Sequence, residues 1–192
     1  LDAAMNLLTL AAPLLVLMGV SHSIAVAQPD DPLAGEKRII LKGNKGEQLD
    51  IGSVTFMPGA DGIRYTLTID HSHFTDYFLS MKEMKCLEGP ELWCHLPYPY
   101  EQPRTVSKNN FSWLAHDLLF MYKKKGEFGA NFWNGIYYKM TLNNGRITGV
   151  AQAIDLNQLA APPDDLTLPP FGEFERTDIE PHPRFLPFVE IR

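Results

Sequence analysis

The chain is poor in cysteine, in basic charge and in long apolar runs, and each shortage excludes a class of protein. Its 192 residues include two cysteines, and 17 lysines and arginines stand against 23 aspartates and glutamates, for a formal net charge of −6. Negative charge gives no electrostatic attraction to the phosphates of a nucleic acid. We therefore predict no nucleic-acid partner, and we read the one basic run, Lys123-Lys124-Lys125, as a solvated turn.

After the N-terminal region, no apolar run approaches the ~20 residues that a membrane-spanning helix needs. The run from Leu7 to Val20 is itself too short to span comfortably, and it is followed by the small-x-small pattern Ala25-Val26-Ala27. We predict a secretory signal peptide over residues 1–27, with Met5 as its start. No lysine or arginine precedes the apolar run, and a buried N-terminal helix is the alternative. The mature protein is expected to be periplasmic or secreted, without a membrane span.

Motifs of the common enzyme classes are also missing. The chain contains no G-x-S-x-G nucleophile elbow, no C-x-x-C pair and no glycine-rich phosphate loop followed by a helix. The acidic pairs Asp30-Asp31 and Asp164-Asp165 lie in proline-rich flanks, which would not hold two carboxylates at a defined separation. We therefore expect a non-catalytic protein that needs no cofactor.

The two cysteines are the most informative local feature. Cys86 and Cys94 flank a Gly89-Pro90 turn, and cysteines of an exported chain are usually oxidised. We predict a disulfide that clips a hairpin, which contributes on the order of 2–3 kcal/mol for a loop of this size. A redox pair or a metal-binding pair fits the spacing less well.

Short strands separated by turn signals account for most of the chain. Alternation of apolar and polar residues is clearest from Ile63 to Asp70. Further strands are expected at 37–42, 48–57, 76–86, 92–96 and 117–122, with bulges at Gly52 and near residues 82–83 where the apolar parity changes. A short helical turn is expected over Phe111–Ala115, after the capping pair Asn109-Asn110.

Asn144-Gly145 is the preferred dipeptide of a type I′ hairpin turn. A two-residue loop at this point fixes which residues face each other. The predicted pairs are Leu142 with Ile147, Met140 with Gly149, Tyr138 with Ala151 and Ile136 with Ala153. The pairing of large with small residues indicates either simple packing complementarity, or a curved sheet with space across that face.

From Ala160 onward prolines and acidic residues increase, and we predict an extended strap over 160–192 that packs on a domain formed by 28–159. Aromatic anchors in the strap indicate a final strand from Phe185 to Ile191. The predicted fold is mainly β: a small antiparallel barrel or sandwich with one short helix. In outline the chain resembles small secreted barrels of the calycin (lipocalin-like) type, a resemblance of architecture without a shared motif.

One candidate site is a group of histidines. His71 and His73 follow a predicted strand, where an H-x-H pattern places both imidazoles on one face. A third ligand from His95 or His116 would complete a zinc or copper site. The alternative is a pair of exposed histidines in a turn.

The other candidate site is aromatic. Trp93, Tyr98, Tyr100, Trp133 and Tyr138 lie in or beside predicted loops, with polar neighbours. Such residues suit a small hydrophobic or sugar-like ligand. The alternative is that a β-protein of this size simply buries them in its core.

Three functions are consistent with these patterns. The first is an exported, non-catalytic protein that binds a small apolar or aromatic ligand in a cavity lined by Tyr65, Leu67, Tyr138 and Met140. The second is a metal-binding protein or metal-dependent hydrolase that uses the histidines. The third is an envelope structural or interaction protein whose strap binds a protein partner, and loss of assembly on truncation after Leu159, with the fold intact, would favour it. We favour the first, because a curved antiparallel sheet usually encloses something.

Overall fold

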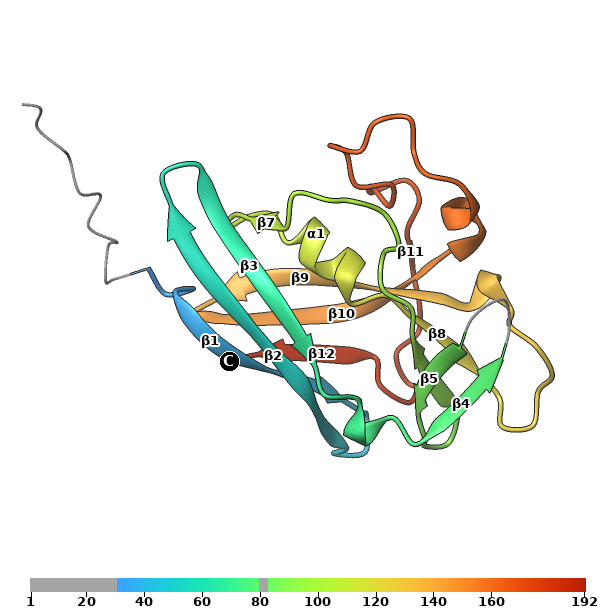
Figure 1. Ribbon diagram of the computed structural model, residues 1–192. Coiled ribbons are helices and arrows are strands. Elements are labelled where there is room, and N and C mark those ends of the chain that lie inside the picture. The colour runs from blue at the N-terminus through green and yellow to red at the C-terminus, as the bar shows by residue number, and fades with distance from the viewer. Residues whose placement is uncertain (1–30, 80–82) are drawn as a thin grey trace, which may run out of the picture.

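The computed structural model describes residues 31–79 and 83–192, which form one curled antiparallel β-sheet (Figure 1). The strands pair in the order β4-β5-β6-β8-β9-β10-β12-β1-β2-β3-β7, and β11 pairs with β10. Their bounds are β1 Gly35–Lys42, β2 Gln48–Gly59, β3 Gly62–Ile69, β4 Asp76–Leu79, β5 Glu83–Leu87, β6 Leu92–His95, β7 Thr105–Val106, β8 Phe120–Lys123, β9 Gly135–Asn143, β10 Arg146–Ile154, β11 Thr177–Asp178 and β12 Phe188–Ile191. The mainly β, barrel-like fold is thus confirmed, and the predicted signal peptide lies outside the described residues.

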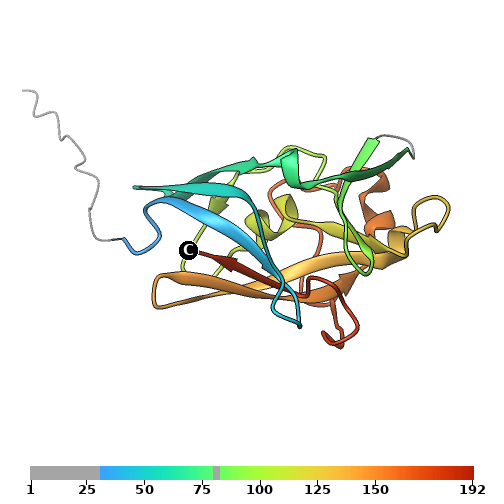
Figure 2. The same ribbon diagram turned by 90° about the horizontal axis from the view of Figure 1, so that it is seen from below.

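The helices are short and lie between the layers of the curled sheet or at its ends. They are α1 (Ser112–Asp117) and the 3-10 helices η1 (His71–His73), η2 (Phe132–Asn134) and η3 (Leu156–Ala160). In Figure 2 the layer of β2 and β3 lies on one side of α1, and β9 and β10 lie on the other. No helix in the described part of the chain has the length and apolarity that crossing a membrane requires.

The predicted bulge at Gly52 is present. The pairing of β1 with β2 shifts register between Ile39 and Ile40, which face Gly52 and Asp50, so that Ile51 is the extra residue. Gly52 has a φ of 140°, and a Cβ at this position would overlap the carbonyl oxygen of Thr68, which requires glycine. The bulge resets the alternation of β2, and apolar residues on both sides of it therefore reach one core.

The β9–β10 hairpin has the predicted turn and register. Asn144 and Gly145 have φ values of 50° and 75°, as a type I′ turn requires, and all four predicted pairs are formed. Gly149 also faces Val189 of β12, and a Cβ on Gly149 would lie 2.7 Å from Val189 Cγ1. Packing against β12 therefore explains the small residue at this position.

One predicted strand was wrong, and the bounds of another are shifted. The segment 76–86 is not one bulged strand but two paired strands, β4 and β5, in which Tyr77 faces Lys85. The change of apolar parity marked a chain reversal, and its connection at 80–82 lies outside the described residues. Helix α1 continues to Asp117, so the strand expected at 117–122 is displaced to β8.

The C-terminal segment contributes a strand to the interior of the sheet. β12 lies between β10 and β1, where Ile191 faces both Ile147 and Ile39. The backbones of Arg38 and Arg192 also exchange two hydrogen bonds, of 2.7 and 3.1 Å. A truncation after Leu159 would therefore remove an internal strand, and it cannot separate an interaction role from folding.

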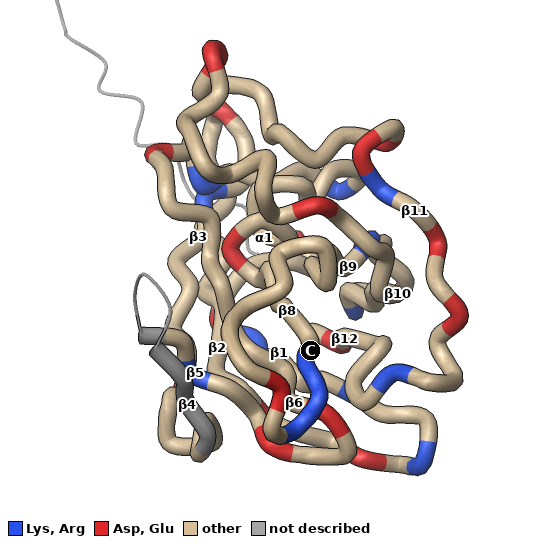
Figure 3. The backbone as a smooth tube through the Cα atoms, turned by 90° about the vertical axis from the view of Figure 1, so that its right-hand side faces the viewer, with Lys and Arg blue, Asp and Glu red and all other residues tan. Residues whose placement is uncertain are grey.

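The core lies inside the curl and consists of two clusters. The larger cluster contains Trp93, whose indole N–H donates to the Tyr138 hydroxyl at 3.0 Å; that hydroxyl in turn donates to the Leu186 carbonyl at 2.8 Å. The smaller cluster surrounds the cysteine pair and reaches Phe171 of the C-terminal segment. Acidic and basic residues are interspersed along the backbone (Figure 3).

Candidate functional site

An apolar pocket of about 430 Å³ opens where the β5–β6 hairpin, the segment 96–100 and the helices η2 and η3 meet. Its lining residues are Met84, Leu96, Pro97, Pro99, Tyr100, Phe132, Leu156, Asn157, Leu159 and Ala160. This volume and this apolar lining are typical of sites for small molecules. Among the described residues, no charged side chain belongs to the lining.

The proline-rich wall of the pocket is extended and fixed at several points. Proline cannot donate a backbone hydrogen bond, so Pro97 and Pro99 leave no N–H unsatisfied there. Between them, the Tyr98 N–H donates to the His116 carbonyl at 3.0 Å. The Tyr100 hydroxyl crosses to the opposite wall and donates to the Leu159 carbonyl at 2.7 Å. This hydrogen bond joins the two walls and fixes the width of the pocket.

The opposite wall is the helix η3, which begins at a side-chain cap. The carboxylate of Asp155 accepts from the Asn157 backbone N–H at 2.9 Å and from the Asn157 amide Nδ2 at 2.7 Å. A cap of this kind satisfies an otherwise unpaired N–H at the start of a helix. It also fixes the orientation of the Asn157 side chain at the pocket.

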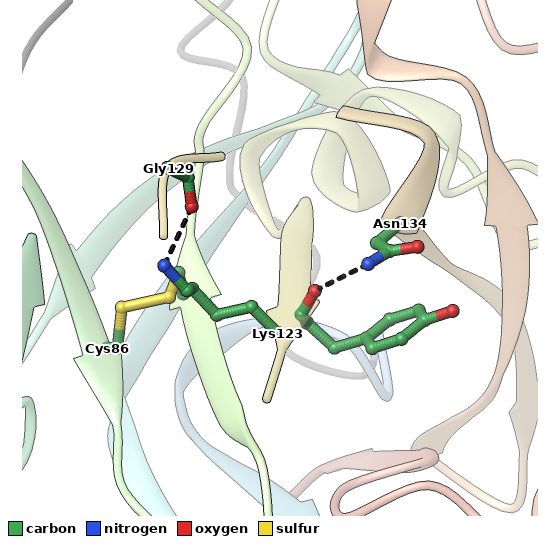
Figure 4. The surroundings of a disulfide bond; sticks show 6 residues. Cys86, Lys123, Gly129 and Asn134 are labelled. Atoms are coloured by element: carbon green, nitrogen blue, oxygen red, sulfur yellow. Dashed lines mark hydrogen bonds between the residues drawn. A yellow bond between two sulfur atoms is a disulfide. The ribbon is translucent and has the colours of Figure 1, made fainter. Parts of the chain in front are cut away.

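The third wall depends on the loop 124–134 and on the cysteine pair. Cys86 and Cys94 face each other across β5 and β6, with their sulfurs at disulfide distance, as predicted. Lys123 Nζ donates to the Gly129 carbonyl at 2.7 Å, and Asn134 Nδ2 donates to the Tyr122 carbonyl at 3.2 Å (Figure 4). These bonds hold the loop that brings Phe132 to the pocket.

Lys123 corrects the prediction that the lysine run is solvated. Its side chain is buried at the end of β8, where its ammonium group meets the backbone carbonyl of Gly129. Lys124 and Lys125 are exposed, as expected. A run of like charges thus has two environments, because the strand ends at its first residue.

Behind the proline wall, a buried histidine attaches the C-terminal segment to helix α1. His116 is fully buried among the rings of Tyr98, Trp113, Tyr137 and Phe171. Its Nε2 accepts from the Phe171 N–H at 3.2 Å, so Nδ1 carries the proton and donates to the Ser112 carbonyl at 2.7 Å. Burial lowers the pKa of His116 to about 4, and the imidazole is neutral at physiological pH.

A buried carboxylate at the end of α1 binds the proline-rich segment 96–102. Asp117 accepts from the Tyr65 hydroxyl at 2.8 Å and from Gln102 Nε2 at 2.6 Å. Burial raises the pKa of Asp117 above its usual range, although both hydrogen bonds favour the ionised form. The segment from 96 to 102 is therefore tied to the end of α1, and its position relative to η3 is fixed.

The predicted aromatic residues fall in three places. Tyr100 lines the pocket, and Tyr98 lies buried behind it with the ring centroids 5.5 Å apart. Trp93 and Tyr138 belong to the main core and contact each other there. Trp133 is 70% exposed on η2 and does not line the pocket. The structure thus brings Tyr98 and Tyr100 together and separates them from the other three.

The cavity expected inside the sheet is not where the pocket lies. Tyr65 and Tyr138 are buried core residues with hydrogen-bonded hydroxyls, and Leu67 and Met140 pack against the same core. None of these four residues lines the pocket. Sequence reasoning missed most of the lining, which consists of ordinary apolar residues in connections. The one available signal was the Pro-Tyr-Pro-Tyr run, which indicated an extended aromatic segment.

The predicted histidines do not form a three-ligand metal site in the described part of the chain. His71 and His73 lie in η1, where three residues make a turn, so residues two apart do not share a face as they would in a strand. The ring centroids of His71 and His95 are 6.4 Å apart, and His95 Nε2 lies 2.9 Å from the Asp117 carbonyl oxygen. Within residues 31–79 and 83–192, no group of three or more His, Cys, Asp or Glu side chains is arranged to hold a metal ion.

No protein-family model matches this chain, and comparisons with curated proteins and with solved structures gave no match.

Proposed function

We propose that this protein binds a small apolar or aromatic molecule in the pocket between the β5–β6 hairpin, the proline-rich wall and η3, and performs no reaction on it. The observation that carries this proposal is the apolar pocket of about 430 Å³, whose lining contains no charged side chain. Burial of apolar surface supplies the affinity, at roughly 25 cal/mol for each Å² removed from water.

The walls support this proposal because they are already positioned for a ligand. The Tyr100–Leu159 hydrogen bond joins the proline-rich wall to η3, and the Asp155 cap holds η3 itself. A site that is formed in advance loses less conformational entropy when its ligand binds. The ten lining residues include no Ser, Cys, Lys, His, Asp or Glu, which supports binding without catalysis.

Binding is tested with the neutral fluorescent probe N-phenyl-1-naphthylamine, whose emission rises in apolar surroundings. We expect saturable binding by the wild type and at least tenfold weaker binding by Leu159→Trp, which fills the pocket. Leu168→Trp is the matched control, because Leu168 is exposed and lies outside the lining.

Ala160→Phe provides a second test at an exposed position of the lining, where the fold tolerates a larger side chain. Thermal melts of each variant establish that it is folded. Equal probe affinity in Leu159→Trp, Ala160→Phe and Leu168→Trp would reject the pocket as the binding site.

We further propose that the protein works outside the cytoplasm, in the periplasm or as a secreted protein. The cysteine pair at disulfide distance supports this, because such pairs persist in oxidising compartments. Thiol alkylation after rapid acid quenching of cells that express the native gene tests it. Unmodified, oxidised cysteines are expected, and fully alkylated ones would contradict export.

The likeness to calycin-type barrels is also a proposal. The curled antiparallel sheet supports it. The strand order differs from that of a simple up-and-down barrel, in which neighbours in the sheet are neighbours in the chain, because β12 lies between β10 and β1. A crystal structure tests this likeness. It would be rejected if the sheet did not close around its core as it does in calycin-type barrels.

A further inference from the structure

The charges at the pocket disfavour an anionic ligand. None of the ten lining residues carries a charge, and the Asp155 carboxylate lies 2.7 Å from Nδ2 of the lining residue Asn157. Two cations of the described residues are engaged elsewhere: Lys123 donates to the Gly129 carbonyl, and Arg176 donates to the Gly172 carbonyl at 2.7 Å and lies over the Tyr137 ring. A carboxylate that entered this pocket would lose its hydration without meeting a cation among the ten lining residues.

The polar atoms of the lining are mainly acceptors. The single hydroxyl hydrogen of Tyr100 is used on the Leu159 carbonyl, which leaves the lone pairs of its oxygen to accept. Pro97 and Pro99 contribute carbonyl groups and no N–H. A ligand group that donates a hydrogen bond therefore finds partners here more easily than one that only accepts.

The side chain of Asn157 adds a further hydrogen-bond acceptor to the lining. Because the Asp155 carboxylate only accepts, the Asn157 amide must point its NH₂ group toward Asp155, and its Oδ1 is left as an acceptor. One hydrogen of Nδ2 is donated to the Asp155 carboxylate. The other is the last side-chain donor among the lining residues, and the adjacent negative charge of Asp155 makes it a poor partner for an anion.

We propose that the pocket selects a neutral molecule with an apolar body and one hydrogen-bond donor, such as an alcohol or a phenol, over a carboxylic acid of the same shape. The donor pairs with the Asn157 Oδ1 or the Tyr100 hydroxyl oxygen, and the apolar body contacts the leucines and Phe132. This inference rests on the proposed function, because it specifies the ligand of the same pocket.

The test uses three compounds with one ring system: 2-naphthol, naphthalene and 2-naphthoate. Their affinities for the full chain are measured at pH 7.5 by displacement of N-phenyl-1-naphthylamine. We expect 2-naphthol to bind at least tenfold more tightly than 2-naphthoate and about fivefold more tightly than naphthalene. The comparison with naphthalene isolates the hydroxyl group from the apolar body.

The variant Asn157→Leu removes the amide acceptor and keeps the backbone N–H that Asp155 caps. It is expected to abolish most of the advantage of 2-naphthol over naphthalene while naphthalene binds as before. Gln158→Leu is the matched control. The Gln158 side chain is next to Asn157 in the chain, but it is exposed and does not line the pocket. Loss of the same advantage in Gln158→Leu would show that Asn157 is not the acceptor and would overturn its assigned role.

The results separate this inference from the proposed function. If 2-naphthoate binds as tightly as 2-naphthol, or if 2-naphthol has no advantage over naphthalene, the inferred ligand class is wrong although the pocket binds. If neither the probe nor any of the three compounds binds, the proposed function fails and the inference fails with it.

Discussion

At the scale of single residues, His116 makes the attachment of the C-terminal segment sensitive to pH. It is fully buried, and its neutral form holds the Phe171 N–H and the Ser112 carbonyl at the same time. A protonated imidazole has no acceptor, so protonation breaks the bond from Phe171 and places a charge among aromatic rings. The attachment of the C-terminal segment to α1 therefore depends on pH.

The sign of this effect follows from the lowered pKa. The folded protein holds His116 at a pKa of about 4, below the ordinary 6.5, so between these values the unfolded chain binds more protons. The contribution of neutral His116 to the free energy of unfolding is complete above pH 6.5 and is lost as the pH falls toward 4. A difference of this size corresponds to about 3 kcal/mol of unfolding free energy.

Urea unfolding at pH 7 and at pH 4.5 measures this loss. His116→Gln is the comparison, because glutamine offers a donor and an acceptor but does not titrate. We expect the variant to be less stable at pH 7 and to lose less stability on acidification than the wild type. Parallel losses in the two proteins would exclude His116 as the cause.

At the scale of elements, β12 decides whether the sheet is continuous. Its backbone pairs with β10 on one side and with β1 on the other, and Val189 and Ile191 are buried in the main core. Removal of β12 would leave two unpaired strand edges and a gap in the core, each of which costs stability.

Deletion of residues 187–192 is therefore expected to abolish cooperative unfolding. The matched comparison is deletion of 164–168, an exposed stretch in the same C-terminal segment, which we expect to lower the melting temperature by only a few degrees. Circular dichroism melts of both proteins measure the difference. A cooperative melt in the 187–192 deletion would mean that β10 and β1 do not depend on β12.

The elements that sequence predicted correctly are those determined by neighbours in the chain. The Asn144-Gly145 turn fixes the β9–β10 register locally, and the bulge at Gly52 follows from a change of parity within one strand. The same signal failed over 76–86, because a parity change also occurs where one strand ends and its antiparallel partner begins. The place of β12 in the sheet was not predictable, since it depends on pairing with strands far away in sequence.

At the scale of the whole molecule, the pocket is a product of connections rather than of the sheet. Apart from Met84 in β5, its lining residues come from segments that follow β6, β8 and β10. These segments converge because the strands that precede them are neighbours or are separated by β9 alone. Sequence indicated the aromatic wall through Tyr98 and Tyr100. It gave no sign of Leu156 and Leu159, because leucines in a short helix look like any other core residue.

This arrangement predicts where a ligand changes the dynamics of the protein. Connections open more easily than paired strands, so a ligand that joins them should slow their local opening. The measurement is amide hydrogen exchange by mass spectrometry, with and without saturating 2-naphthol. We expect slower exchange in peptides that cover 96–102, 131–135 and 155–161. The internal control is the β1–β2 hairpin, which contributes no residue to the pocket and should exchange at the same rate. Protection of β1 and β2 with none at η3 would show that the ligand binds within the curled sheet instead.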